Sequence, residues 1–402
     1  MGPRAQFDAS SVREAGAKMK VTFSRQTLMS GIALTQNLVS ATGTLPILSN
    51  LLIEADSKDV NLVTTDLEAF AKVSLQAKIE ESGRITAPAK TLGDIVRRLP
   101  DDDISITTSG TRLTLTCNRN VYHLATMSAD DYPEWPKSES VTRITLRQAD
   151  LKRLLRSTTF AIPLRDPRKV LMGALFVLNA EGLICVATDG RKLGKSMAEP
   201  VEIRGKAECS AIIPGRILTE LDKALGEEGE IELALTERQA LFSLPNLTYL
   251  TSLIEGSFPK YDSVIPESFK KIIELPKATL DETIGRASIL AERKFNSIVL
   301  GFSQNNLDIH AQSFEDGSYD GQVQVNYEGE PFKIAFSHQY LHEVFKVMPD
   351  AVVRMKVKDN TAPVVFEADS DPTSLFLVMP VRMHDLDGPG EEESPEQAED
   401  EE

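Results

Sequence analysis

One supersecondary unit occurs three times along this chain of 402 residues, and this repeat constrains the fold more than any other feature. In each copy a strand ends at Pro or Ser, a leucine follows four residues later, and a helix-breaking residue follows after twelve. The three copies are marked by Pro88, Pro214 and Ser337, at spacings of 126 and 123 residues. Thr-Asp pairs at 65–66 and 188–189 repeat with the same 123-residue spacing. Because solenoid repeats usually span about 20 to 50 residues, this longer period predicts three repeated domains.

The pattern inside each unit indicates the fold class. An alternating strand is followed by an amphipathic helix, as in residues 143–158, and short alternating strands such as 61–64 come next. Two helices and several antiparallel strands per unit favour an α+β fold, with helices packed on one face of the sheets. The expected divisions are an N-terminal extension at 1–18, domains at 19–138, 139–266 and 267–383, and an acidic tail at 384–402.

Composition narrows the class of protein. No run of 18 apolar residues occurs, and residues 1–18 lack the apolar stretch of a secretory signal. The three cysteines, Cys117, Cys185 and Cys209, do not have the paired spacing of metal ligands. They fit small buried side chains in a reducing compartment. We therefore expect a cytoplasmic protein.

Charge is distributed unevenly along the chain. Ten acidic and no basic residues lie in 384–402, so residues 1–383 carry only −6 of the net charge of −16. The composition of this tail predicts disorder. Basic side chains recur on the predicted helices: Arg97, Arg98, Lys152, Arg153, Arg156, Arg216, Lys223, Arg286, Arg293, Lys294 and Lys346. For any single helix a solvated surface is the ordinary explanation, but the bias in three copies favours contact with a polyanion.

The motifs of common enzymes are missing from the sequence. There is no G-x-S-x-G, no P-loop and no G-x-G-x-x-G. His338 and His342 share one face of a helix, as metal ligands do, but the other two copies have no histidine there, which favours surface histidines. The segment 188–191 (T-D-G-R) fits a tight turn better than a catalytic aspartate loop. We expect no catalytic residue, no metal and no cofactor.

Four segments carry a family resemblance: T-L-P-I-L-S-N-L-L (44–52), V-A-T-D-G-R-K-L (186–193), F-P-K-Y-D-S-V-I-P (258–266) and L-V-M-P-V-R-M (377–383). With them in this order, residues 19–383 resemble the bacterial replicative sliding clamp, the β subunit of DNA polymerase III. The resemblance implies a head-to-tail homodimeric ring of six domains around duplex DNA, with helices lining the channel. It implies a non-catalytic processivity factor at the nucleoid. The implied partners are the polymerase α subunit, the clamp loader, and other polymerases and repair proteins that carry clamp-binding peptides.

The resemblance also implies a peptide-docking pocket between the second and third domains, an apolar groove for Leu or Phe side chains. The matching positions are Leu171, Thr188, Gly190, Arg191, Lys192, Leu193, Pro259, Ser263, Val264, Tyr340, Thr361, Pro363, Leu377, Val378, Met379, Pro380, Val381 and Arg382. Ring closure is implied between Tyr122 and Leu124 of the first unit and Ile289 and Leu290 of the third. The DNA-contacting positions expected on this basis are Arg97, Arg98, Lys152, Arg156, Arg165, Arg168, Lys169, Arg216, Lys223 and Arg286.

Three positions depart from the family pattern. Thr42 stands where the pattern has arginine, Ser263 where a long basic side chain is frequent, and Pro363 where serine is frequent. The first affects DNA contact and the other two affect the choice of partner peptide. Two alternative functions remain open: a scaffold or regulatory protein that uses the same pocket, and an enzyme with an unrecognised site. For the acidic tail, control of partner access, repulsion of DNA and simple solubility are the three readings.

Overall fold

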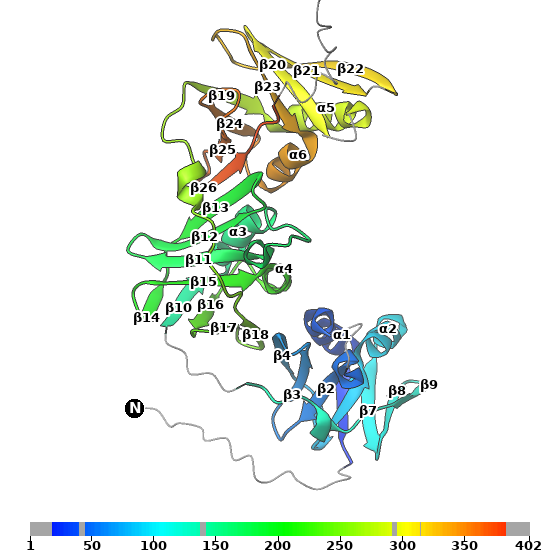
Figure 1. Ribbon diagram of the computed structural model, residues 1–402. Coiled ribbons are helices and arrows are strands. Elements are labelled where there is room, and N and C mark those ends of the chain that lie inside the picture. Colours follow the sequence, from blue (N-terminus) through cyan, green and yellow to red (C-terminus); the bar gives the residue numbers. More distant parts are fainter. Residues whose placement is uncertain (1–17, 40–44, 137–141, 292–295, 314, 383–402) are drawn as a thin grey trace, which may run out of the picture. The chain divides into compact units, whose positions relative to one another are not determined.

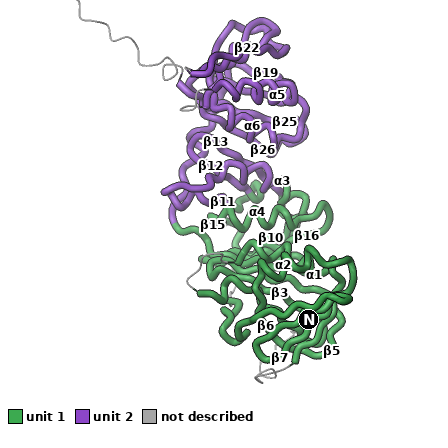
Figure 2. Tube along the Cα trace, turned by 90° about the vertical axis from the view of Figure 1, so that its right-hand side faces the viewer, with its two compact units in different colours: residues 1–152, 177–183, 199–255 green, residues 153–176, 184–198, 256–402 purple. Residues whose placement is uncertain are grey.

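The computed structural model describes residues 18–39, 45–136, 142–291, 296–313 and 315–382. Nearly all of the expected N-terminal extension, the acidic tail, and the positions Thr42, Arg293 and Lys294 lie outside these residues. The chain forms two compact units, which Figure 2 shows in different colours. Unit 1 comprises residues 1–152, 177–183 and 199–255, and unit 2 comprises 153–176, 184–198 and 256–402. The division between the units falls inside the second repeat.

The three marker helices confirm the predicted repeat. They are α2 (Ala89–Arg98), α4 (Gly215–Ala224) and α6 (His338–Val347), and they begin directly after Pro88, Pro214 and Ser337. Each helix ends at a capping residue whose backbone N–H donates to the carbonyl four residues earlier: Leu99, Leu225 and Met348. Pro100, Gly226 and Pro349 follow, and proline and glycine do not extend a helix. The spacing read from the sequence is therefore the spacing of real helix boundaries.

Each repeat also opens with a strand and a first helix, as predicted. The strands are β1 (Lys20–Ser24), β10 (Thr142–Arg147) and β19 (Lys271–Pro276), and the helices are α1 (Arg25–Thr35), α3 (Gln148–Thr159) and α5 (Lys277–Ala287). The hydroxyl of Ser24 accepts a hydrogen bond from the Thr27 backbone N–H at 3.1 Å, which caps α1. Helices α1 and α2 lie side by side in unit 1, and α5 and α6 lie side by side in unit 2 (Figure 1).

Unit 1 contains two antiparallel sheets. The five-stranded sheet has the order β5 (Lys78–Glu81), β1, β7 (Asp103–Ser109), β8 (Arg112–Cys117), β9 (Asn120–Ala125). The nine-stranded sheet has the order β14 (Glu202–Gly205), β10, β16 (Glu230–Leu235), β17 (Gln239–Ser243), β18 (Leu247–Ser252), β4 (Ala69–Leu75), β3 (Val60–Thr65), β2 (Asn50–Ala55), β6 (Gly83–Pro88). Strands of the first and second repeats therefore share one sheet.

Unit 2 holds the third repeat and the part of the second that adjoins it. Five of its strands follow one another in the order β13 (Lys192–Ala198), β26 (Asp371–Val378), β25 (Val364–Ala368), β24 (Val352–Val357), β19. A separate four-stranded sheet has the order β22 (Gly317–Gln324), β21 (Asn306–Ser313), β20 (Ser297–Ser303), β23 (Phe332–Ser337). The core between these sheets and α5 and α6 contains the buried rings of Phe302, Phe336, Phe366 and Phe376. The second repeat also contains β11 (Gly173–Asn179), β12 (Gly182–Thr188) and β15 (Cys209–Pro214).

Equivalent strand pairs join successive repeats at two places in the chain. In unit 1, β4 of the first repeat pairs with β18, the last strand of the second. In unit 2, β13 of the second repeat pairs with β26, the last strand of the third. The first members begin at Ala69 and Lys192, 123 residues apart, and the second members begin at Leu247 and Asp371, 124 apart. One junction geometry is therefore repeated along the chain.

The Thr-Asp landmark forms a tight turn before each of these junction strands. Oδ1 of Asp189 accepts hydrogen bonds from the backbone N–H groups of Arg191 and Lys192, at 2.8 and 2.9 Å. The Thr188 hydroxyl donates to the Lys192 carbonyl at 2.7 Å. Gly190 has a φ of +91°, a backbone conformation that glycine adopts without strain. The prediction of a turn at residues 188–191 is confirmed.

Burial matches the expectation for two of the three cysteines. Cys117 and Cys185 are buried, and Cys209 is half-buried. Burial raises the pKa of the Cys185 thiol to about 12, although the nearby Thr158 hydroxyl opposes this shift. A buried protonated thiol of this kind acts as a small apolar side chain. None of the helices in the described part of the chain has both the length and the apolar content that crossing a bilayer requires.

Candidate functional site

A hollow in unit 2 gathers residues from four separate segments of the chain. It holds about 140 Å³ of free space and is lined by Arg168, Leu171, Thr188, Gly190, Arg191, Lys192, Leu193, Pro259, Lys260, Tyr261, Val264, Leu377 and Met379. Its floor lies on the junction of β13 and β26, where Leu193 is paired with Leu377. Directly opposed residues on antiparallel strands place their side chains next to each other. The hollow therefore has an apolar floor that exists only because two repeats join there.

Backbone hydrogen bonds hold the wall of this pocket. The N–H of Met379 donates to the carbonyl of Arg191 at 2.7 Å, which ties the end of β26 to the turn before β13. Two residues later the N–H of Val381 donates to the carbonyl of Ala335 in β23, also at 2.7 Å. Met379 is therefore fixed between two anchored backbone points while its side chain lines the pocket.

Lys192 places a buried positive charge beside the pocket. Its side chain is only 7% exposed, and its ammonium forms an ion pair with Glu343 of α6. The same ammonium lies 5.4 Å from the ring centroid of Tyr340 and 5.9 Å from that of Phe160. A buried charge is costly unless it is paired, and aromatic faces also attract cations. Glu343 thus neutralises the charge of Lys192, and Lys192 also lines the pocket.

Arg168 lies in the pocket wall, although the sequence placed it with the DNA-contacting residues. Its guanidinium binds both carboxylate oxygens of Asp166, at 2.9 and 2.8 Å, and donates to the Asp189 carbonyl at 3.1 Å. This guanidinium lowers the pKa of Asp166 to about 2. Arg168 therefore links the loop after α3 to the turn at residues 188–191. The neighbouring Arg165 and Lys169 are exposed in the same loop.

The structure brings together ten of the eighteen residues expected in the pocket: Leu171, Thr188, Gly190, Arg191, Lys192, Leu193, Pro259, Val264, Leu377 and Met379. Eight others do not line it: Ser263, Tyr340, Thr361, Pro363, Val378, Pro380, Val381 and Arg382. The assignment of these eight residues to a peptide site stays a prediction. Lys260 and Tyr261, which the sequence interpretation missed, do line it. They lie inside the F-P-K-Y-D-S-V-I-P segment, so their neighbours Pro259 and Val264 were the available signal.

Strand geometry and local hydrogen bonds explain why several of these eight residues do not line the hollow. Successive side chains of a strand point to opposite faces, so Val378 faces away when Leu377 faces the pocket. The Ser263 hydroxyl donates to the Lys260 carbonyl at 2.7 Å and so bonds to its own turn. The Thr361 hydroxyl donates to Asp359 at 2.8 Å in the turn after β24. Tyr340 lies behind the wall, where its ring contacts the ammonium of Lys192.

The expected DNA-contacting cations lie on helices and one loop, and several are already paired with carboxylates of this chain. Arg97 pairs with Asp94 at 2.8 Å and Lys223 with Glu220 at 2.7 Å. Lys152 pairs with Glu227, and Arg216 pairs with Asp66. Arg98, Arg156 and Arg286 are exposed on α2, α3 and α5. The Arg97–Asp94 pair is exposed on both sides, and such pairs contribute about 0 to 1 kcal/mol, so a phosphate group competes readily for Arg97. The side chain of Lys152 is only 14% exposed and is less accessible. The contact of these cations with DNA stays a prediction.

The residues expected at the dimer interface lie on or near two sheet edges. Tyr122 and Leu124 are on one edge strand, and Ile289 and Leu290 are near the other. Strand β9, which contains Tyr122 and Leu124, is the outermost strand of the five-stranded sheet of unit 1. Strand β22 is the outermost strand of the four-stranded sheet of unit 2. Ile289 and Leu290 follow α5 in that unit, and the side chain of Ile289 is 78% exposed. An exposed edge strand with apolar neighbours is a template for pairing with another chain.

The two histidines of α6 do not meet as metal ligands. Nδ1 of His342 lies 2.8 Å from a carboxylate oxygen of Asp281 in α5. Burial, with the charge of His342, lowers the pKa of His338. Within the described ranges, no cluster of three or more His, Cys, Asp or Glu has a geometry that could hold a metal ion. His342 is exposed, and His338 is half-buried.

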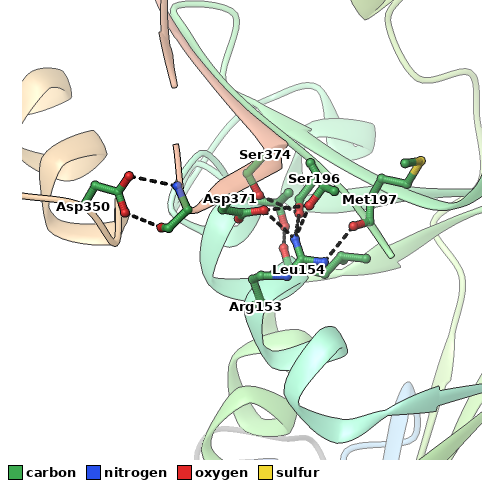
Figure 3. A network of polar contacts seen from close by, with 10 residues as sticks. Arg153, Leu154, Ser196, Met197, Asp350, Asp371 and Ser374 are labelled. Atoms are coloured by element: carbon green, nitrogen blue, oxygen red, sulfur yellow. Dashed lines mark hydrogen bonds and ion pairs between the residues drawn. The ribbon is translucent and has the colours of Figure 1, made fainter. Parts of the chain in front are cut away.

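A polar network braces the other end of the β13–β26 pair (Figure 3). Arg153 of α3 donates to Ser196 and Asp371 at 3.1 Å each and to the Met197 carbonyl at 2.8 Å. The Ser374 hydroxyl donates to Ser196 at 2.8 Å across the strand pair. Arg153, one of the basic side chains of the predicted helices, therefore binds polar groups of its own chain. The network fixes α3 to both strands that form the pocket floor.

We expect Arg153→Met to lower the free energy of unfolding by about 2 to 3 kcal/mol, since it leaves the nearly buried carboxylate of Asp371 unpaired. Partial exposure of Arg153, at 31%, places the loss below that of a fully buried pair. The control is Arg147→Met, because Arg147 is 70% exposed in its pair with Asp150. That substitution should cost at most about 1 kcal/mol. Equal losses in urea unfolding of both variants would contradict a bracing role for Arg153.

Comparison with known proteins gives a consistent result. Three family models match the chain in order: the N-terminal domain of the DNA polymerase III beta subunit at residues 19–136, its central domain at 145–260 and its C-terminal domain at 262–382. The beta sliding clamp of Pseudomonas aeruginosa is 32% identical over 370 residues, which cover 91% of this chain and all of that protein. The beta sliding clamp of Synechocystis is 30% identical over 390 residues, with the same coverage.

Solved structures agree with the sequence relatives. The sliding clamp of Pseudomonas aeruginosa bound to griselimycin matches with a TM-score of 0.85 at 29% identity, over 90% of this chain and 99% of that one. The sliding clamp of Bacillus subtilis matches with a TM-score of 0.84 at 27% identity, over 91% of this chain and all of that one. The likeness therefore extends over nearly all of the three-repeat body.

Proposed function

This chain belongs to the DNA polymerase III beta subunit family, the beta sliding clamps, and we propose that two copies of it close into a ring around duplex DNA. Members of this family are non-catalytic accessory subunits of DNA polymerase III and act as its processivity factor. A ring of this kind holds the polymerase by topology. It therefore needs only weak, non-specific contact with phosphates, which also permits sliding.

The repeated junction is the observation that carries this proposal. In the two junctions of the chain, a strand after the Thr-Asp turn pairs with the last strand of the next repeat. The first repeat has its last strand, β9, at an open sheet edge, and the third repeat has β22 at an open edge. By position along the repeat, β22 corresponds to β4 and β13, and β9 corresponds to β18 and β26. The remaining pair, β22 with β9, requires a second copy.

Two such pairings close a head-to-tail dimer. Each copy would offer β9, with Tyr122 and Leu124, to β22 of its partner copy, beside Ile289 and Leu290. The contact is heterologous, and it closes because six similar repeats complete one turn. Exposed apolar side chains near both edges support this: Val121 is 53% exposed and Ile289 is 78% exposed. Pairing would cover both edges and remove the open templates.

DNA contact in this proposal comes from the basic side chains of the helices and of the loop after α3. Arg98 and Arg156 are exposed helix cations, and Arg165 and Lys169 are exposed in the loop. Such side chains neutralise phosphates without reading bases. Arg168 also lines the pocket wall, where Asp166 holds its guanidinium, and its contact with DNA stays a prediction.

The pocket of unit 2 is the proposed tether. Its apolar floor and few polar groups suit a short peptide with Leu or Phe side chains. A related clamp has been solved with griselimycin bound, which supports a ligand site on this scaffold. We propose that the polymerase α subunit, the clamp loader, and other polymerases and repair proteins dock here in turn, in the cytoplasm at the nucleoid. A scaffold that never encircles DNA is the alternative, and it would use the same pocket.

Light scattering tests ring closure directly. The native chain at micromolar concentration is expected to show twice its mass of 44.2 kDa. Ile289→Asp is expected to shift the protein toward monomer, because a carboxylate at the interface must lose its water. The control, Ile272→Asp, changes a side chain of β19 that is 60% exposed, and it should leave the dimer intact. A monomeric native chain would count against the ring.

A further inference from the structure

The lining of the pocket has a one-sided charge. Four of its residues are basic, namely Arg168, Arg191, Lys192 and Lys260, and none is acidic. Arg168 is paired with Asp166, and Lys192 with Glu343. Arg191 and Lys260 are exposed and form no ion pair with any residue in the described part of the chain. The mouth of an apolar pocket thus carries two uncompensated positive charges.

The most acidic segment of the chain follows the pocket residue Met379 after only a few positions in the sequence. Met379 lines the pocket, and the backbone is anchored as far as Val381. Residues 384–402 follow with ten acidic side chains and no basic one. The first acid, Asp385, is six residues beyond Met379. Six residues span at most about 20 Å when extended, so the first acids of the segment are within reach of the pocket mouth.

The sequence of this segment also complements the pocket floor. Leu386 is the only large apolar residue between 384 and 402, and it stands between Asp385 and Asp387. A leucine flanked by two carboxylates matches a site with an apolar floor at Leu193 and Leu377 and cations at its rim. Charge and shape therefore point to the same occupant.

We propose that residues 384–402 occupy the pocket of their own chain, with Leu386 on the apolar floor and its acidic neighbours beside Arg191 and Lys260. The proposal rests on the pocket being the docking site for partner peptides, as argued above. A partner peptide then has to displace the segment before it binds. The segment lowers the apparent affinity of every competing peptide by the same factor, so peptides with weak apolar anchors lose occupancy of the pocket first.

The size of the effect follows from tethering. A segment on a short flexible connection has an effective concentration on the order of millimolar at its site. An intrinsic affinity of only a few hundred micromolar then weakens the apparent affinity for a competing peptide by about threefold to tenfold. Salt screens the contribution of the carboxylates over a Debye length of about 10 Å at 0.1 M and about 3 Å at 1 M. The competition is therefore strongest at low salt.

The test uses the full chain in three forms: native, all ten acids of 384–402 changed to Asn or Gln, and Leu386→Ser. Two fluorescent hexapeptides with the same Leu and Phe residues serve as probes, one with two Lys and one with two Asp. Neutralisation should tighten binding of both probes by threefold to tenfold at 50 mM salt, and the gain should vanish at 1 M. Leu386→Ser should give part of this gain.

Four results would overturn the proposal. Unchanged affinities would remove the segment from the pocket. Tighter binding of the Asp probe with weaker binding of the Lys probe would show that the segment acts through its overall negative charge and does not occupy the pocket. Full competition in Leu386→Ser would remove the leucine from the floor. Inhibition that fades as the protein is diluted would assign the pocket to the tail of a second copy.

A second readout separates this proposal from the function of the pocket. The methyl resonance of Met379 is expected to differ between the native and the neutralised chain at low salt, and the resonance of the buried Met355 is expected to be unchanged. If neither probe binds any form, the pocket is not a peptide site, and the proposed function fails. The Met379 resonance still decides whether the segment occupies it, since an unchanged resonance would reject occupancy.

Discussion

Met379→Asp is expected to weaken the binding of a Leu- and Phe-bearing peptide by roughly 100-fold. The side chain lines the pocket between two anchored backbone points, so the new carboxylate cannot turn far from the bound peptide. A bound apolar peptide would strip water from this charge, which costs about 3 kcal/mol. Fluorescence anisotropy with a labelled peptide measures the loss.

The matched control for this variant is Ile272→Asp. It makes the same change of charge in the same unit, at a side chain that is 60% exposed and outside the pocket lining. Its affinity for the peptide should equal that of the native chain. Equal losses in the two variants would mean that charge on unit 2, and not the hollow, governs binding.

Gly194→Ala is expected to lower the free energy of unfolding by about 3 kcal/mol, the upper part of the range for overpacking. Gly194 lies in β13 where the strand meets the end of α3. An added methyl group would clash with the Ser157 carbonyl oxygen and would lie 2.9 Å from the Thr158 Cα and 2.8 Å from a ring carbon of Phe160. Because backbone atoms are among these neighbours, relief requires the end of α3 to move away from β13.

The same substitution at Gly285 provides the control. A methyl group there would have no atom within 4 Å, and the position lies inside the exposed part of α5. Gly285→Ala should therefore stabilise the protein by up to about 1 kcal/mol, because alanine loses less backbone freedom in a helix. Opposite signs in urea unfolding support close packing of α3 on β13. An unchanged free energy of unfolding in Gly194→Ala would show that the packing of α3 on β13 adjusts to the added methyl group.

Local signals in the sequence were enough to place the repeated helices. The helices do begin directly after Pro88, Pro214 and Ser337. Helix starts and ends depend on residues within a few positions of the boundary, so the local sequence predicts them. The turn at residues 188–191 follows from Asp-Gly chemistry in the same way. These features depend on neighbours along the chain, so composition and spacing determine them.

Long-range pairing was beyond such signals. Leu193 meets Leu377 across 184 residues, and periodicity alone does not select that partner strand. Arg153 has the sequence context of a solvated helix face, yet it turns toward Asp371 because the β13–β26 junction lies there. The hydrogen bond from Arg168 to the Asp189 carbonyl could not be predicted for the same reason, since Asp189 lies in another turn. The pocket was identified by family resemblance, and its exact lining required the strand register.

The retention of the protein on DNA tests the central claim most directly. The protein is loaded on nicked circular DNA by a clamp loader, passed through a sizing column at a salt concentration that removes ionic contacts, and compared with the same DNA after linearisation. A closed ring predicts retention on the circle and loss from the linear form, because the protein slides off the free ends. Ile289→Asp should be lost from both. Equal retention of the native protein on circular and linear DNA would contradict the ring.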